Sequence, residues 1–178
     1  MTLEVVSYNP EWKLWFNTLR KHIWVKINEL VVDIIHIGST SIEGMSAKPI
    51  IDMDIVINDW TNFPEIVKRL SKIGYRHIGD LGITGREVFD QDHTPEYLHH
   101  LYLCHINSLP YRNHVLLRKH LHENPEDFER YKKLKTELAK KYQNREKYWR
   151  SKTELILEFL EKQGISEKEL NTIRKQNS

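Results

Sequence analysis

The stretch HIGSTSIEGMSAKPIIDMDIVI, residues 36–57, decides the fold. It joins two apolar, β-branched runs, 31–37 and 50–57, which are typical of strands. The segment between them is rich in small residues and contains Gly44 and Pro49, as loops do. The sequence therefore predicts two strands joined by a loop that opens with Gly38 and Ser39.

The second of these strands carries the motif Asp52-Met53-Asp54. Residues two apart on a strand point to the same face, so both carboxylates lie on one side and the neighbouring apolar residues on the other. Two converging carboxylates repel each other unless a cation lies between them. Mg²⁺ (or Mn²⁺) suits this position, because it binds through one or two carboxylates and substrate phosphates. We therefore expect Asp52 and Asp54 to be metal ligands and catalytic residues.

Small and polar residues around the loop suit a phosphate. Gly38 permits close backbone approach, and the hydroxyl of Ser39 is a hydrogen-bond donor. Thr40 follows in the same loop. Lys48, just before the second strand, either reaches a phosphate or neutralises the carboxylates.

Working outward, Asn9-Pro10-Glu11 predicts the start of an N-terminal helix whose apolar residues recur every three or four positions up to Leu30. A helix over 64–70 follows the two strands. Further strands are predicted at 75–78, 86–89 and 99–106.

After Pro110 the pattern is helical throughout, with helices predicted at 112–122, 125–142, 145–161 and 166–176. The predicted fold class is α+β, with an N-terminal helix, a small mixed sheet and a C-terminal helical bundle. We expect one domain over residues 1–178, with the sheet at about 31–107 and the helical part at about 112–176.

Composition is that of a globular domain, with 39% hydrophobic and 29% charged residues. The chain has one cysteine, and no signal peptide or membrane span is recognisable, so a cytoplasmic location without a membrane partner is expected. Residues 1–111 carry a net charge of −4 and residues 112–178 a net charge of +6. An acidic half facing a basic half suits a site for a cation and a phosphate, although a solvated basic helix face gives the same pattern.

At these motifs the chain resembles the nucleotidyltransferase superfamily, and more closely the GrpB family, which is also found fused to some bacterial dephospho-CoA kinases. The resemblance covers roughly residues 5 to 160, and the matching stretches are 8–12, 36–41, 48–52, 100–103, 117–118 and 131–135. It implies a nucleotidyltransferase-like fold, in which Gly38-Ser39 and the Asp52-x-Asp54 motif form the site. The activity of the GrpB family is poorly defined.

Active nucleotidyltransferases resemble one another in a third carboxylate on a later strand. Residues 99–106 are the natural place for it, but they offer only His100, Tyr102 and Cys104 there. Asp90 and Asp92 lie upstream, and their spacing does not place them. This departure makes two-metal catalysis doubtful.

In the helical half, Arg118, Lys135, Tyr148 and Lys152 are expected to face the sheet and bind phosphate. Lys152 falls on an otherwise apolar face, where a cation usually meets an anion. His36 is either a site residue or a core histidine. The ten histidines match no common zinc spacing.

Two functions compete. The first is metal-dependent transfer of a nucleotidyl group from a nucleoside triphosphate; the alternative is a non-catalytic module that binds a nucleotide or a CoA-type ligand on a degenerate site. A nucleotide or another phosphorylated small molecule is the expected partner. Nucleic acid is disfavoured, because the pI is about 8.5 and no strand carries an aromatic and basic platform. Oligomeric state is not indicated.

Overall fold

The computed structural model describes residues 4–142 and 144–177. Its centre is a five-stranded mixed sheet with the order β1-β2-β5-β4-β3. The strands are β1 (Asp33–Ile37), β2 (Ile51–Ile57), β3 (Tyr75–His77), β4 (Arg86–Gln91) and β5 (His99–His105). Only the β2–β5 pair is parallel; the other neighbours are antiparallel.

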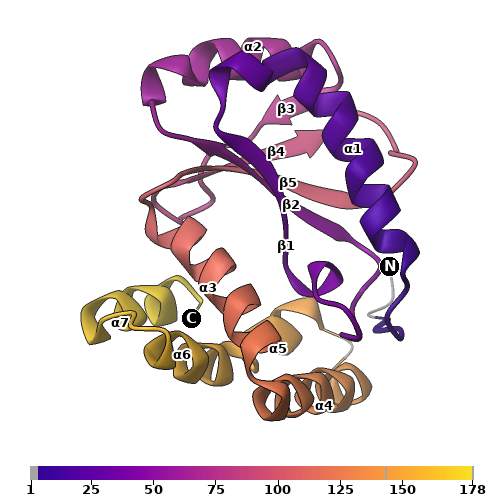
Figure 1. Ribbon diagram of the computed structural model, residues 1–178, viewed down its shortest axis with the longest axis vertical. Helices are drawn as coiled ribbons and strands as arrows, with labels where there is room; N and C mark the ends of the chain where they lie inside the picture. Colours follow the sequence, from indigo (N-terminus) through magenta and orange to yellow (C-terminus); the bar gives the residue numbers. More distant parts are fainter. Residues whose placement is uncertain (1–3, 143, 178) are drawn as a thin grey trace.

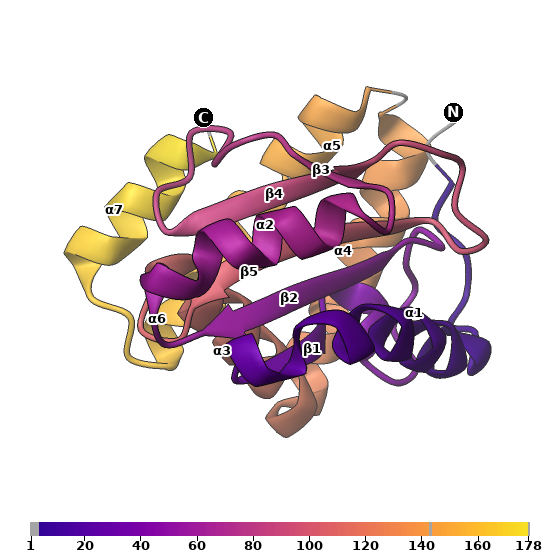
Figure 2. The same cartoon turned by 90° about the horizontal axis from the view of Figure 1, so that it is seen from above.

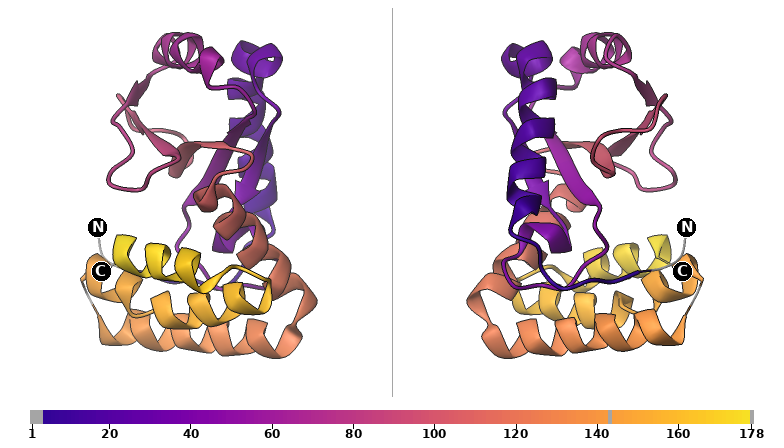
Figure 3. Two further views of the ribbon diagram at one scale, coloured as in Figure 1. Left: turned by 90° about the vertical axis from the view of Figure 1, so that its left-hand side faces the viewer. Right: turned by 90° about the vertical axis from the view of Figure 1, so that its right-hand side faces the viewer.

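The helices form two groups on opposite sides of the sheet (Figures 1 and 2). The first group consists of α1 (Glu11–Ile27) and α2 (Phe63–Ser71). The second consists of α3 (Leu109–Glu123), α4 (Pro125–Lys141), α5 (Arg145–Arg150), α6 (Thr153–Lys162) and α7 (Glu167–Gln176). In Figure 3 the helices α4 to α7 form a layer at the end of the molecule opposite α2, and α3 joins that layer to the sheet.

The largest apolar core lies between the sheet and α1 and α2. Trp12, Ile23 and Ile27 of α1 are fully buried there, as their helical spacing predicts. Met53 of β2 belongs to this core, whereas Asp54 is absent from it. The alternation of β2 therefore turns the two aspartates toward the helical layer formed by α3 to α7.

The strands and most helices agree with the sequence-based prediction, but residues 145–161 do not form one helix. They form α5 and α6, separated at Ser151 and Lys152. The hydroxyl of Ser151 donates to the carbonyl of Lys147 in the preceding turn, a local bond that competes with the regular ladder and bends helices. Lys152 thus lies at the N-cap of α6 rather than on a continuous helical face.

Two local features complete the fold. Ser39–Ser41 forms a 3-10 turn in the loop after β1, and Ser166 and Glu169 form a capping box before α7. No helix in the described part of the chain has the length and apolar character needed to cross a bilayer.

Candidate functional site

A cavity of about 390 Å³ lies between the sheet and the helical layer. Its wall combines residues that are far apart in sequence, because β2, β4 and β5 supply one side and α3 to α6 the other. Nearly all of the sequence-predicted site residues line it: Gly38, Ser39, Thr40, Lys48, Asp52, His100, Tyr102, Arg118, Lys135, Tyr148 and Lys152. The cavity is therefore the candidate site.

Gly38, at the start of the loop after β1, lies next to the side chain of Asp52. Gly38 has φ +68° and ψ −173°, a conformation that is essentially restricted to glycine. A Cβ at this position would lie 2.5 Å from Oδ2 of Asp52. Two constraints therefore require glycine at this position: the backbone conformation, and the space taken by the Asp52 carboxylate.

Asp52 faces the cavity with a histidine as its partner. Oδ1 of Asp52 accepts a hydrogen bond of 2.8 Å from Nδ1 of His100 when that nitrogen is protonated. The two residues lie opposite each other in the parallel register of β2 and β5. Their side chains are 29% and 50% exposed, so solvent and a ligand can reach both.

The Asp54 side chain lies on the same face of β2 as Asp52 but is not accessible to solvent. Its side chain is 0% exposed, and Oδ2 lies 2.8 Å from Nδ1 of His114 on α3. Burial lowers the pKa of His114, but the charge and hydrogen bond of Asp54 outweigh this, and the pKa is raised above its ordinary value. The contact with Asp54 thus favours the charged form of the imidazole, and Asp54 does not line the cavity.

This geometry decides how far the site fits Mg²⁺. Mg²⁺ keeps several of its waters and takes oxygen ligands, so a fully buried carboxylate that contacts an imidazole does not fit it. Asp52 fits as one carboxylate ligand to a Mg²⁺ or Mn²⁺ ion that arrives with a phosphate. Within the described ranges 4–142 and 144–177, Asp52 is the only carboxylate that lines the cavity.

The place of a third carboxylate is taken by other groups. His100 and Tyr102 lie opposite Asp52 and Asp54 on β5. Asp90 is exposed and pairs with Arg76, and neither it nor Asp92 lines the cavity. The upstream aspartates therefore do not complete the site.

Lysines dominate the opposite wall. Lys135 is 2% exposed, and burial together with the charges of Lys152 and Lys48 holds its pKa well below the ordinary value. Burial and the charge of Lys48 also lower the pKa of Lys152, to about 8, although Asp52 opposes the shift. Three ammonium groups therefore face one cavity and repel one another.

Aromatic rings support these lysines. The ammonium groups of Lys48 and Lys152 lie 4.8 and 4.4 Å from the centroid of the Tyr148 ring. Lys135 donates to the backbone carbonyl of Ser46 and lies 5.4 Å from the Tyr131 ring centroid. Cation–π contacts thus stabilise all three ammonium groups, and Lys135 has a backbone carbonyl in addition.

Three predicted positions need separate mention. His36 does not line the cavity: its ring stacks on Phe16 of α1 at 4.7 Å, and burial lowers its pKa to about 4. Its backbone carbonyl accepts a hydrogen bond from Arg118, which does line the cavity. Ser39 is hydrogen bonded to the Tyr131 side chain.

Sequence reasoning missed several wall residues: Arg86, His114, Tyr131 and Trp149. Arg86 reaches the cavity because β4 pairs with β5 in a register that places it opposite Cys104, and no local pattern shows this register. Tyr131 carries a usable signal, since it lies four residues before Lys135 and so shares its helix face.

Comparisons with known proteins agree with this fold. Residues 2–162 match the family model described as GrpB protein. The chain is 30% identical over 136 residues to UPF0157 protein YqkA of Bacillus subtilis, which covers 76% of this chain and 39% of that protein. It is 31% identical over 138 residues to the glutamate-rich protein GrpB of Alkalihalophilus pseudofirmus, covering 75% of this chain and 79% of that one.

Two solved structures extend the comparison. The crystal structure of conserved protein GrpB from Enterococcus faecalis has a TM-score of 0.77 at 27% identity and covers 90% of this chain and 99% of its own. A GLD-2/RNP-8 complex gives a TM-score of 0.56 at 15% identity, covering 85% and 59%. This second likeness concerns the fold alone, and the predicted nucleotidyltransferase-like α+β class is confirmed. With a match over residues 2–162, the chain belongs to the GrpB family.

Proposed function

We propose that the cavity binds a phosphorylated nucleotide, with the phosphates on the lysine wall. The observation that carries this proposal is the excess of positive charge around an enclosed space. Five lysine and arginine side chains line the cavity against the single carboxylate of Asp52: Lys48, Arg86, Arg118, Lys135 and Lys152. Lys135 and Lys152 have no carboxylate partner among the described ion pairs; burying such cations costs stability, and a bound polyphosphate offsets that cost.

Size and lining support a nucleotide in particular. A cavity of about 390 Å³ is within the range of small-molecule sites. Tyr148 and Trp149 lie in the wall beside the lysines, where an aromatic surface suits a base or another planar group. The Gly38-Ser39 loop also lines the cavity, and its glycine permits close approach of phosphate oxygens to the backbone.

A divalent cation enters this proposal with the ligand. Mg²⁺ or Mn²⁺ bound to the phosphates would take Asp52 as its protein ligand, and the ion would supply charge neutralisation at that end of the cavity. Binding is therefore the function that the geometry supports best. Nucleotidyl transfer would require a second accessible carboxylate, and Asp54 is occupied by His114.

The test is calorimetric titration with ATP, GTP, CTP, UTP, coenzyme A and inorganic tripolyphosphate, each with Mg²⁺ and with a chelator. We expect at least one nucleotide to bind more tightly than tripolyphosphate, because the aromatic wall adds to the phosphate contacts. Lys152→Met should weaken binding at least about tenfold, the effect of losing a charge-assisted contact. Lys147→Met removes the same charge from an exposed position on α5 and should leave binding unchanged.

Two results would overturn the proposal: binding of none of these compounds, or equal affinities in the two lysine variants. Release of pyrophosphate from a nucleoside triphosphate, lost in Asp52→Asn, would replace the binding function by nucleotidyl transfer.

A further inference from the structure

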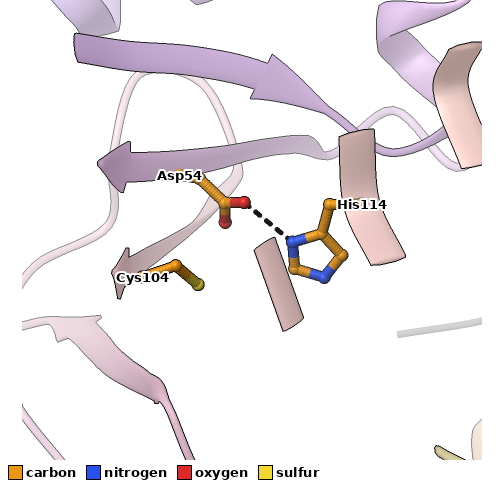
Figure 4. A group of neighbouring side chains, drawn as sticks. All are labelled: Asp54, Cys104 and His114. Atoms are coloured by element: carbon orange, nitrogen blue, oxygen red, sulfur yellow. Dashed lines mark hydrogen bonds and ion pairs between the residues drawn. The ribbon is translucent and has the colours of Figure 1, made fainter. Parts of the chain in front are cut away.

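A second cluster of reactive side chains lies behind the cavity wall, where β2, β5 and α3 meet. It consists of Asp54, Cys104 and His114, and one potential ligand atom from each lies within 4.8 Å of the others (Figure 4). Asp54 and Cys104 are fully buried and do not line the cavity, whereas His114 does. The phosphate-binding proposal uses none of these three side chains.

The cluster contains a polar atom that the described protein leaves unsatisfied. Oδ2 of Asp54 contacts His114, but Oδ1 is buried and has no hydrogen-bond partner among the described residues. Figure 4 shows this second oxygen on the side of Asp54 that faces Cys104. A buried, unpartnered carboxylate oxygen is costly, so its position indicates a missing partner.

We propose that Asp54, Cys104 and His114 bind a zinc-type transition-metal ion. Carboxylate, thiolate and imidazole together are the ligand set of Zn²⁺ and related borderline metals, whereas Mg²⁺ does not take sulfur. With the thiolate and the carboxylate each contributing one negative charge and the imidazole neutral, a divalent ion makes the buried site neutral. That balance removes the electrostatic cost of burying it.

The distances require a small adjustment. Donor atoms around a tetrahedral Zn²⁺ lie about 3.2–3.8 Å apart, given bonds of about 2.0–2.3 Å. The 2.8 Å contact between Asp54 and His114 must therefore open slightly, and the longer separations, up to 4.8 Å, must close. Rotation about side-chain bonds is enough for shifts of this size. The fourth ligand position is then open to water on the side of His114, which borders the cavity.

The surroundings of Cys104 favour the thiol when no cation is present. Burial and the charge of Asp54 raise the pKa of the Cys104 thiol, and the guanidinium group of Arg86 opposes this shift only in part. A bound metal ion supplies the positive charge that a thiolate needs at this position. No spacing in the sequence indicates the cluster, because its members are 50 and 10 residues apart and belong to three elements.

The test uses the full chain freed of metal with a chelator and titrated with Co²⁺, without nucleotide. Co²⁺ replaces Zn²⁺ and reports its ligands, since a bound thiolate gives an intense charge-transfer absorption. Cys104 is the chain's one cysteine, so any such band identifies it. We expect one Co²⁺ per chain, a thiolate band, displacement by Zn²⁺ and no displacement by excess Mg²⁺.

Variants assign the remaining ligands. Cys104→Ser should abolish the band, and His114→Gln should weaken Co²⁺ binding at least about tenfold. His122→Gln, at an exposed position of the same helix, is the matched control and should bind like the parent protein. Absence of a thiolate band in the parent protein overturns the proposal, whether or not the variants fold. Because no nucleotide is present, this outcome is independent of the phosphate-binding proposal.

Discussion

Charged side chains on the sheet side and on the helical side of the cavity differ in whether they have ion-pair partners. On the sheet wall, each aspartate has a histidine partner, His100 for Asp52 and His114 for Asp54. On the helical wall, Lys135 and Lys152 have no carboxylate partner among the ion pairs of the described residues. Each aspartate therefore has a histidine that stabilises charge on one of its oxygens, whereas these two lysines have no carboxylate among the described ion pairs.

The difference in ion-pair partners indicates which kind of ligand the cavity binds. A cavity that required two metal ions would leave its carboxylates open and repelling one another. Here burial, together with repulsion among the lysine side chains, lowers the pKa values of Lys135 and Lys152. The lack of a carboxylate partner for these two lysines among the described ion pairs favours an anion as the principal ligand.

The largest effect is expected on the sheet wall, at the buried pair. Asp54→Asn leaves His114 without its carboxylate, and we expect the free energy of unfolding of the metal-free protein to fall by about 3 kcal/mol. Asp52→Asn, in a pair that solvent reaches, should lower it by less than about 1 kcal/mol. Urea unfolding of both variants at pH 6 measures the two values. Equal losses of unfolding free energy would show that the contact between Asp54 and His114 contributes no more than the exposed contact between Asp52 and His100.

If Asp54→Asn only relieved repulsion between the two carboxylates, the free energy of unfolding would rise instead of falling. The sequence alone predicts such a rise, because it shows no partner for either aspartate. The histidines reverse it, because each aspartate already has a group that stabilises its charge.

Gly38→Ala should have the next largest effect on the sheet wall. It places a non-glycine residue at φ +68° and a methyl group 2.5 Å from the Asp52 carboxylate. We expect a loss of about 2–3 kcal/mol in unfolding free energy, part from the backbone and part from the displaced carboxylate. Gly79→Ala, also at positive φ but with nothing within 4 Å of the added Cβ, measures the backbone part alone. If both variants lose the same amount, Asp52 is not held against Gly38.

On the helical wall, a substitution should stabilise the empty protein. Lys152→Met keeps the apolar volume and removes a cation that burial disfavours, so the free energy of unfolding at pH 7 should rise by about 1 kcal/mol. The exposed control Lys147→Met should change it by less than about half of that. A loss of stability in Lys152→Met would instead show that the ammonium group already has a strong partner.

The smallest effect is the pH dependence of the same residue. The folded pKa of Lys152, about 8, is below its unfolded value of 10.5, so the unfolded chain binds more protons between these pH values. This group therefore makes the free energy of unfolding rise with pH from about 8 to 10.5, and it contributes no slope below that window. The slope should be smaller in Lys152→Met, which urea unfolding at several pH values would measure. Identical slopes would place the ammonium group in solvent.

Much of this site follows from local sequence patterns. Strand alternation correctly places Asp52 and Asp54 on one face, and the Gly38-Ser39 turn beside them. Hydrophobic periodicity does not reveal the helix break at Ser151, where the side chain bonds to the Lys147 carbonyl. Nor does it reveal the stacking of His36 on Phe16, which depends on tertiary packing.

Longer-range features could not be predicted. The histidine partners come from β5 and α3, which are 48 and 60 residues away from the aspartates they contact. No local pattern in the sequence ties these positions together. The sequence therefore indicated the carboxylates of the site but not that the protein itself neutralises them.

The most direct measurement of the central claim is calorimetric titration of ATP at pH 8 in two buffers of different ionisation enthalpy, which yields the number of protons taken up on binding. An anion on the lysine wall raises the pKa of Lys152 from about 8, so the complex should take up a substantial fraction of a proton. At pH 6 the uptake from this group should be close to zero, because the lysine is already charged, and in Lys152→Met the uptake at pH 8 should largely disappear. If ATP does not bind, the titration is made with whichever of the tested nucleotides binds most tightly. Binding at pH 8 with no proton uptake, or binding by none of the nucleotides, would contradict an anion site on the lysine wall.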